Sequence, residues 1–203
     1  MKYRRYLDNF LGQKTELAVL RYLVIDREEA GVREIARGVK IGPPNVLRAL
    51  KVLEGNDILV KKNVGRSVLY RLNTGHYLVE KVIRPLFVNE KNITDELSRF
   101  VMKNIKFPVE SAVLFGSIAR GREKDGSDID VLFIVPNSES VDRITDELLE
   151  FNNKAIKYFG NYFSPLVMRR KDFLQKHKAG DQLIENIIRD GLVIGGKLIS
   201  EIF

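Results

Sequence analysis

The chain has 203 residues, 44% of them hydrophobic and 30% charged, which is enough apolar material for two cores and excludes a disordered or collagen-like chain. No apolar run approaches the roughly 18 residues that cross a bilayer, and Met1–Arg5 lack the apolar segment of a signal peptide, so we predict a cytoplasmic protein without a membrane partner. Because the chain has no cysteine and only two histidines, His76 and His177, any metal site must be built from carboxylates.

The positive charge is confined to the first third of the chain. Residues 1–75 contain 15 Lys and Arg against 8 Asp and Glu, a net charge of +7, whereas residues 76–203 contain 19 of each. A basic module joined to a neutral one indicates a polyanionic partner for the first part and a different role for the second. We therefore predict a module that meets a polyanion at 1–75, and we expect a helical connector at 76–107 and a further domain at 108–203.

The first module has the pattern of a helix-turn-helix followed by a hairpin. Apolar residues at helical spacing predict a helix over 15–25 that Thr15 caps, and a short helix over 32–37 that stops at Gly38. Pro43 and Pro44 open a third helix over 45–54. Two β-rich runs, 58–62 and 67–72, flank a turn that contains Gly65 and predict a hairpin. Together these elements predict a winged helix.

Residues 12–73 resemble the winged helix-turn-helix domains of ArsR- or MarR-type transcription regulators, through Ile35-Ala36, Pro44–Glu54 and Asp57–Leu59. In such domains the third helix enters the major groove of double-stranded DNA and the wing lies along the backbone. The resemblance implies groove contacts by Asn45, Arg48 and Lys51, and phosphate contacts by Lys61, Lys62 and Arg66. Two other interpretations stay open: the residues form an ordinary solvated surface, or the module binds a protein.

Residues 76–107 are predicted to be helical. Apolar residues from Tyr77 to Phe87 recur at helical spacing, Pro85 is expected to kink the segment, and a second helix restarts at Thr94. Such a connector either packs on both domains or pairs two chains. Because winged-helix regulators generally bind DNA as dimers, we expect a homodimer.

The residues that carry chemistry follow this connector. An apolar strand over 111–115 turns at Gly116 into a helix, whose first N–H groups and the Ser117 hydroxyl can hold phosphate oxygens. On a second strand Asp128 and Asp130 are two residues apart, so their carboxylates leave the same face and repel each other unless a cation lies between them. Hard oxygen ligands suit Mg²⁺, which completes its shell with water and substrate phosphate.

The stretch Phe115–Gly121 with Ser127–Asp130 resembles the signature of the DNA polymerase β-like nucleotidyltransferase superfamily and, within it, the minimal nucleotidyltransferases, over about residues 94–196. The resemblance implies nucleotide binding by Gly116 and Ser117, and magnesium binding by the catalytic pair Asp128 and Asp130. It also implies transfer of a nucleoside monophosphate from a Mg-bound nucleoside triphosphate, with ATP expected, to an acceptor hydroxyl. Arg120 either supports the loop or faces phosphate. Some minimal nucleotidyltransferases are antitoxins that modify a HEPN-type toxin, so such a toxin or another protein is a candidate acceptor.

One element of that family is missing, namely the third carboxylate that a later strand usually supplies. The matching strand, 162–168, contains no acid, and Asp172 is expected on the next helix, where it is a poor substitute. Two hypotheses remain: a DNA-binding nucleotidyltransferase, or a catalytically weak or inactive winged-helix regulator that senses nucleotide or acts as an antitoxin. Further helices at 141–159 and 181–189 and a strand at 192–194 complete an α/β (α+β) chain: a winged helix, a helical connector, and a mixed β-sheet flanked by helices.

Overall fold

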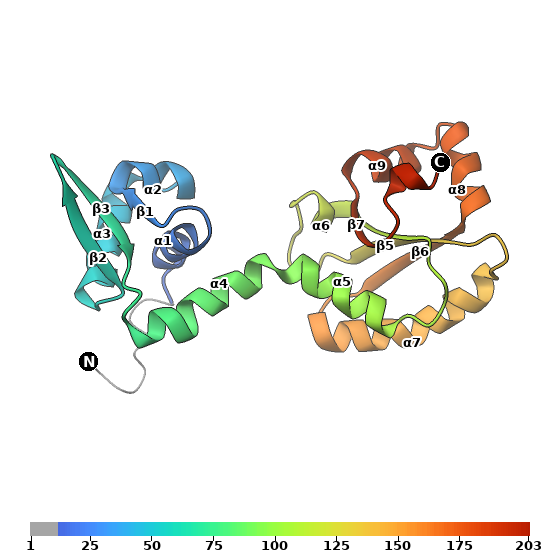
Figure 1. The fold of residues 1–203 in the computed structure, drawn as a ribbon, viewed down its shortest axis with the longest axis horizontal. Coiled ribbons are helices and arrows are strands. Elements are labelled where there is room, and N and C mark those ends of the chain that lie inside the picture. The colour runs from blue at the N-terminus through green and yellow to red at the C-terminus, as the bar shows by residue number, and fades with distance from the viewer. Residues whose placement is uncertain (1–11) are drawn as a thin grey trace. The chain divides into compact units, whose positions relative to one another are not determined.

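The computed structural model describes residues 12–203 and divides the chain into two compact units, Met1–Ile93 and Thr94–Phe203 (Figure 1). The segment predicted as a connector, 76–107, is thus divided between the two units. Met1–Arg5, on which the signal-peptide prediction rests, lie outside the described residues. Within residues 12–203, none of the helices combines the length and the apolar character that a bilayer crossing requires.

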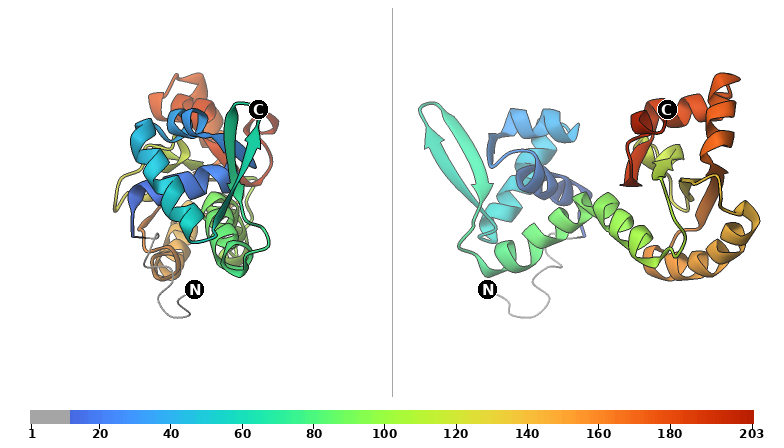
Figure 2. Two further views of the ribbon diagram at one scale, coloured as in Figure 1. Left: turned by 90° about the vertical axis from the view of Figure 1, so that its left-hand side faces the viewer. Right: turned by 45° about the vertical axis from the view of Figure 1, so that its right-hand side comes forward.

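Unit 1 is a winged helix, as the sequence predicts. Its three helices are α1 (Lys14–Ile25), α2 (Val32–Val39) and α3 (Pro43–Gly55), and its strands are β1 (Glu29–Gly31), β2 (Leu59–Val64) and β3 (Ser67–Leu72). The strands form an antiparallel sheet in the order β1-β3-β2, and the β2–β3 hairpin extends beyond the helices of its own unit (Figure 2). The prediction of Thr15 as a helix cap is wrong: Gln13 holds the cap position and Thr15 lies inside α1.

The core of unit 1 follows the apolar pattern of its helices. Val46, Leu50 and Leu53 of α3 are buried together with the apolar side of α1. The two prolines begin α3, where a missing N–H costs no intrahelical hydrogen bond. The unit ends with a π-helical turn, Val79–Ile83, and α4 (Arg84–Lys91), so the helix is irregular just before Pro85, as a proline kink predicts.

Unit 2 contains a mixed four-stranded sheet in the order β6-β5-β4-β7, in which β5 and β6 are parallel and the other pairs antiparallel. The strands are β4 (Ser111–Phe115), β5 (Ile129–Val135), β6 (Phe163–Arg169) and β7 (Leu192–Gly196). The helices are α5 (Ile93–Asn104), α6 (Gly116–Ala119), α7 (Val141–Phe159), α8 (Arg170–Lys178) and α9 (Gln182–Asp190), followed by a 3-10 turn, Ile199–Glu201. The predicted fold class is therefore confirmed.

The sheet of unit 2 has helices on both faces, α5 and α7 on one and α8 and α9 on the other (Figure 1). Strand β5 is buried on both sides, which explains its nearly continuous apolar run. Its side chains alternate: Val131 and Phe133 pack toward α5 and α7, whereas Leu132 and Ile134 pack toward α8 and α9. By the same alternation, Asp130 belongs to the face that α8 and α9 cover.

Candidate functional site

Asp128 and Asp130 lie where β5 begins, and hydrogen bonds hold the backbone around them. The Asn161 amide donates to the Ser127 carbonyl at 2.9 Å, and the Ile129 N–H donates to the Tyr162 carbonyl at 2.8 Å, so the chain is fixed on both sides of Asp128. Asp130 is paired in register with Phe115 of β4 and with Ser164 of β6. Asp128, which the sequence predicts on the strand, directly precedes β5, and it lies close enough for its charge to act on Asp130. Asp128 is exposed and Asp130 is half-buried.

Gly116 brings the turn that the sequence predicts to bind phosphate against this pair. Its φ of +77° is left-handed, which favours glycine, and a Cβ at this position would collide with the carboxylate of Asp130. The backbone of Gly116 and the carboxylate of Asp130 are thus in direct van der Waals contact. The structure brings together the two halves of the motif, which are 14 residues apart in the numbering.

Asp130 is the electrostatically perturbed member of the site. Its pKa is raised above the ordinary aspartate value, first because burial removes the carboxylate from water and second because Asp128 carries a like charge. A hydrogen bond from the Ser164 hydroxyl and the positive charge of Arg120 act in the opposite direction. A cation between Asp128 and Asp130 would relieve the repulsion that raises this pKa.

The helix expected after Gly116 is a single turn, α6, which ends in a Schellman arrangement. The Arg122 N–H donates to the Ser117 carbonyl at 2.9 Å, the Gly121 N–H donates to the Ile118 carbonyl at 3.0 Å, and Gly121 adopts a φ of +61°. This closure fixes Arg120 and Arg122 close to the turn that carries Ser117. Ser117 is half-buried, and Arg120 is exposed but close enough to influence the charge of Asp130.

The position beside Asp130 on the neighbouring strand is occupied by Ser164, not by an acid. Asp172 lies on α8, where the Arg169 Nε donates to its Oδ2 at 2.7 Å, so its carboxylate is already engaged. Among residues 12–203, no group of three or more His, Asp or Glu side chains is placed to hold a metal ion. The donor set is therefore two carboxylates, which fits an ion such as Mg²⁺ that takes its remaining ligands from water and phosphate.

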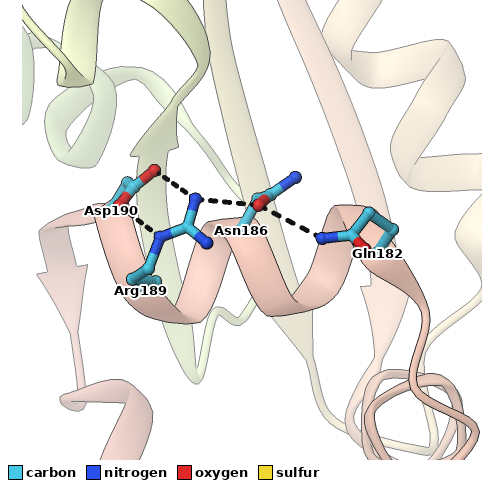
Figure 3. A network of polar contacts seen from close by, with 4 residues as sticks. All are labelled: Gln182, Asn186, Arg189 and Asp190. Carbon is cyan, nitrogen blue, oxygen red and sulfur yellow. Dashed lines mark hydrogen bonds and ion pairs between the residues drawn. The ribbon is translucent and has the colours of Figure 1, made fainter.

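An arginine-rich pocket opens at the end of α6. The sequence pattern does not predict it. Its volume is about 730 Å³, and its lining comes from the α6 end and from α9: Ala119, Arg120, Arg122, Asn186, Arg189 and Asp190. Figure 3 shows how the α9 side chains are connected: Arg189 donates to both carboxylate oxygens of Asp190, each at 2.9 Å, and to the Asn186 Oδ1 at 2.9 Å. Arg122 follows the motif directly, but Arg189 is remote in sequence and only the fold brings it here.

The predicted DNA-contacting residues are all exposed in unit 1. Asn45, Arg48 and Lys51 lie on α3, and the Arg48 Nη2 donates to the Asn45 Oδ1 at 3.0 Å. On the wing, Lys61 and Lys62 are consecutive strand residues and so point to opposite faces of the hairpin. Lys61 forms an ion pair with Glu54 of α3 at 2.8 Å. Arg66 lies in the turn between β2 and β3.

Comparisons with known proteins give one family and several remote structural similarities. The family model described as the nucleotidyltransferase domain matches residues 91–192. No curated protein sequence matches the chain. Among solved structures, reduced HlyU from Vibrio cholerae is 14% identical over 43% of this chain and 84% of its own, with a TM-score of 0.36. A homodimeric winged helix-turn-helix DNA-binding domain from Mycobacterium bovis is 19% identical over 45% and 77%, with a TM-score of 0.34. A crystal structure of a toxin–antitoxin with AMP-PNP is 16% identical over 54% and 77%, with a TM-score of 0.37.

Proposed function

The chain belongs to the nucleotidyltransferase domain family, and from this premise we propose that it transfers a nucleoside monophosphate from a Mg-bound nucleoside triphosphate, with ATP the expected nucleotide, to an acceptor hydroxyl. The observation that carries the proposal is the contact between the Gly116 turn and the Asp130 carboxylate, with Asp128 close enough for its charge to act on Asp130. Such a transfer needs two parts side by side: a turn that binds phosphate, and a pair of carboxylates that binds metal, here Asp128 and Asp130, which we call the carboxylate clamp.

Each residue of the site has a definite task in this reaction. Gly116 lets the backbone approach the phosphates, the Ser117 hydroxyl donates a hydrogen bond to them, and the Arg120 guanidinium offsets their negative charge. Asp128 and Asp130 would hold magnesium, which would draw charge from the phosphoryl oxygens. A bond forms between the acceptor oxygen and the α-phosphorus, the bond from the α-phosphorus to the leaving pyrophosphate breaks, and the hydroxyl proton passes to solvent. Solvent is its destination because Ser164 and the engaged Asp172 provide no general base.

The direct test is label transfer from an α-labelled nucleoside triphosphate to protein or nucleic acid acceptors. Asp128→Asn and Asp130→Asn should each abolish transfer, because one remaining carboxylate binds magnesium weakly. Asp172→Asn is the matched control: it removes an aspartate of the same unit that Arg169 already engages, and it should leave transfer unchanged. Equal loss of transfer in all three variants would contradict the assignment of the site.

A second candidate function has its own support. Because Ser164 stands beside Asp130 where a third carboxylate would complete the clamp, a catalytically weak regulator, whose DNA binding responds to nucleotide, is the alternative. Gel-shift titrations with and without Mg·ATP distinguish the two functions. A nucleotide acts as effector only if it changes the affinity for DNA. If the affinity for DNA is unchanged by nucleotide and label transfer occurs, nucleotidyl transfer is the function.

We extend the proposal to the partners of both units. Unit 1 binds double-stranded DNA, supported by the exposed cations of α3 and the wing and by the charge excess of residues 1–75. The protein acts as a homodimer in the cytoplasm, and a HEPN-type toxin is one protein acceptor to test. Co-expression with such a toxin, followed by mass analysis of the toxin for an added nucleotidyl group, tests that acceptor, and sedimentation measures the oligomeric state.

A further inference from the structure

The arginine-rich pocket has a charge that the rest of its unit does not share. Residues 94–203 contain 16 Lys and Arg and 17 Asp and Glu, so the unit as a whole has no excess of positive charge. The pocket nevertheless gathers three guanidinium groups, Arg120, Arg122 and Arg189, against the single carboxylate of Asp190. Their field lowers the pKa of Asp190, first through its hydrogen bond with Arg189 and also through the charges of Arg120 and Arg122. The pocket therefore attracts anions.

Donors in this pocket are held in place and remain available. Asp190 and Asn186 engage the Nε and Nη2 atoms of Arg189, which fixes the guanidinium plane (Figure 3) and leaves the two Nη1 hydrogens without an acceptor among the residues that the structure describes. Within the same described range, Arg120 and Arg122 form no side-chain hydrogen bond or ion pair. Planar guanidinium groups with free donors match the geometry of phosphate.

The pocket is distinct from the turn that holds the nucleotide but adjacent to it. Its lining begins at Ala119, at the end of α6, and includes neither Gly116 nor Ser117. Arg120 connects the two places, because its charge acts on Asp130 as well as on Asp190. A ligand in the pocket would thus lie next to Asp128 and Asp130, the residues proposed to hold magnesium. It would lie outside the turn at Gly116 and Ser117, where the nucleotide phosphates would bind.

We propose that Arg122 and Arg189 bind a phosphate group of the acceptor and so present its hydroxyl to the metal site. This inference rests on the proposed transferase function, in which the nucleotide would occupy the turn at Gly116 and Ser117. Arg122 and Arg189 outnumber the single carboxylate of Asp190 in this pocket, and Arg120 adds to the positive field, which suits the negative charge of a phosphate monoester. Among the acceptors to test, this pocket favours a phosphorylated molecule over a neutral alcohol or an unmodified protein.

Inorganic phosphate is the probe for this pocket. The full chain is titrated with phosphate, without magnesium or nucleotide, at an ionic strength held constant with chloride, and the melting temperature reports binding. Arg122→Gln and Arg189→Gln should each weaken phosphate binding by about tenfold or more, as loss of a charged hydrogen bond does. Arg122 is exposed and tests the pocket even if Arg189→Gln destabilises α9. The matched control is Arg143→Gln, an exposed arginine of α7 paired with Glu139, which should change nothing.

The second part of the experiment separates the pocket from the nucleotide site. Saturation with Mg·AMP-PNP should lower the affinity for phosphate without abolishing its binding, because both ligands lie in the field of Arg120 while Arg122 and Arg189 stay available. The affinity for Mg·AMP-PNP should be equal in wild type and Arg122→Gln. Mutually exclusive binding of phosphate and Mg·AMP-PNP, equal losses in the Arg143→Gln control, or no phosphate binding by the wild type would each overturn the proposal. Because the phosphate titration needs no transfer, its failure is distinguishable from failure of the transferase assay.

Discussion

The contact between Gly116 and Asp130 gives the sharpest prediction for the Gly116→Ala variant. The new Cβ faces two penalties at this position. A left-handed φ of +77° costs a non-glycine residue about 1–2 kcal/mol, and the Cβ must displace the Asp130 carboxylate. Displacing that carboxylate from its place against Gly116 adds a cost of overpacking, typically about 1–3 kcal/mol. The free energy of unfolding of unit 2 should therefore fall by roughly 3 kcal/mol.

Gly160→Ala supplies the control, because it carries the first penalty without the second. Gly160 ends α7 with a φ of +78°, and its added Cβ would meet nothing within 4 Å. We expect this control to lose about 1–2 kcal/mol and to bind Mg·AMP-PNP as the wild type does. Gly116→Ala should lose about twice as much stability, and its affinity for Mg·AMP-PNP should fall by about tenfold or more, since Asp130 no longer faces the position proposed for the metal.

Calorimetry and circular dichroism measure the stability of the full chain, which contains no tryptophan, and titration calorimetry measures nucleotide affinity. Since 1 kcal/mol shifts the melting temperature of a domain of this size by about 4–8 °C, the two variants are readily resolved. Equal melting temperatures and equal nucleotide affinities in Gly116→Ala and Gly160→Ala would refute the reasoning that a close approach to Asp130 requires glycine.

Three further predictions concern the clamp, the wing and the core. Ser164→Asp places a third carboxylate beside Asp130 and should raise the rate of label transfer by about 10²-fold; an unchanged rate would show that the missing acid does not limit the reaction. On the wing, Lys62→Ala should weaken binding to duplex DNA and reduce the slope of log affinity against log salt by about 0.9, whereas Lys61→Ala should do less because Glu54 already pairs with Lys61. Fluorescence anisotropy across a salt series measures both, and equal slopes would contradict the distinction. Phe133, which is fully buried in the sheet, should lose about 3–5 kcal/mol of unfolding free energy on change to Ala, and a denaturant titration showing less than 1 kcal/mol would refute its place in the core.

The sequence alone determined the elements whose signals are local. Helical periodicity predicts α1, α3 and α7, because one apolar face repeats within each segment. Alternation around a glycine turn predicts the β2–β3 hairpin, since its two strands are adjacent in the chain. The close spacing of Gly116-Ser117 and Asp128-Ile129-Asp130 likewise identified the candidate site, because both halves of the motif lie within one strand–turn–strand segment.

Tertiary structure decided what depends on pairing between distant segments. Strand β1 has three residues, too few for a periodic signal. Its residues are extended because they pair with β3 through backbone hydrogen bonds. Only the parallel register of β5 and β6 places Ser164 beside Asp130, and only the packing of α9 on the sheet brings Arg189 to the end of α6. Strand register and helix packing are set by the whole core, so neither the place of Ser164 beside Asp130 nor that of Arg189 in the arginine-rich pocket is marked in the local sequence.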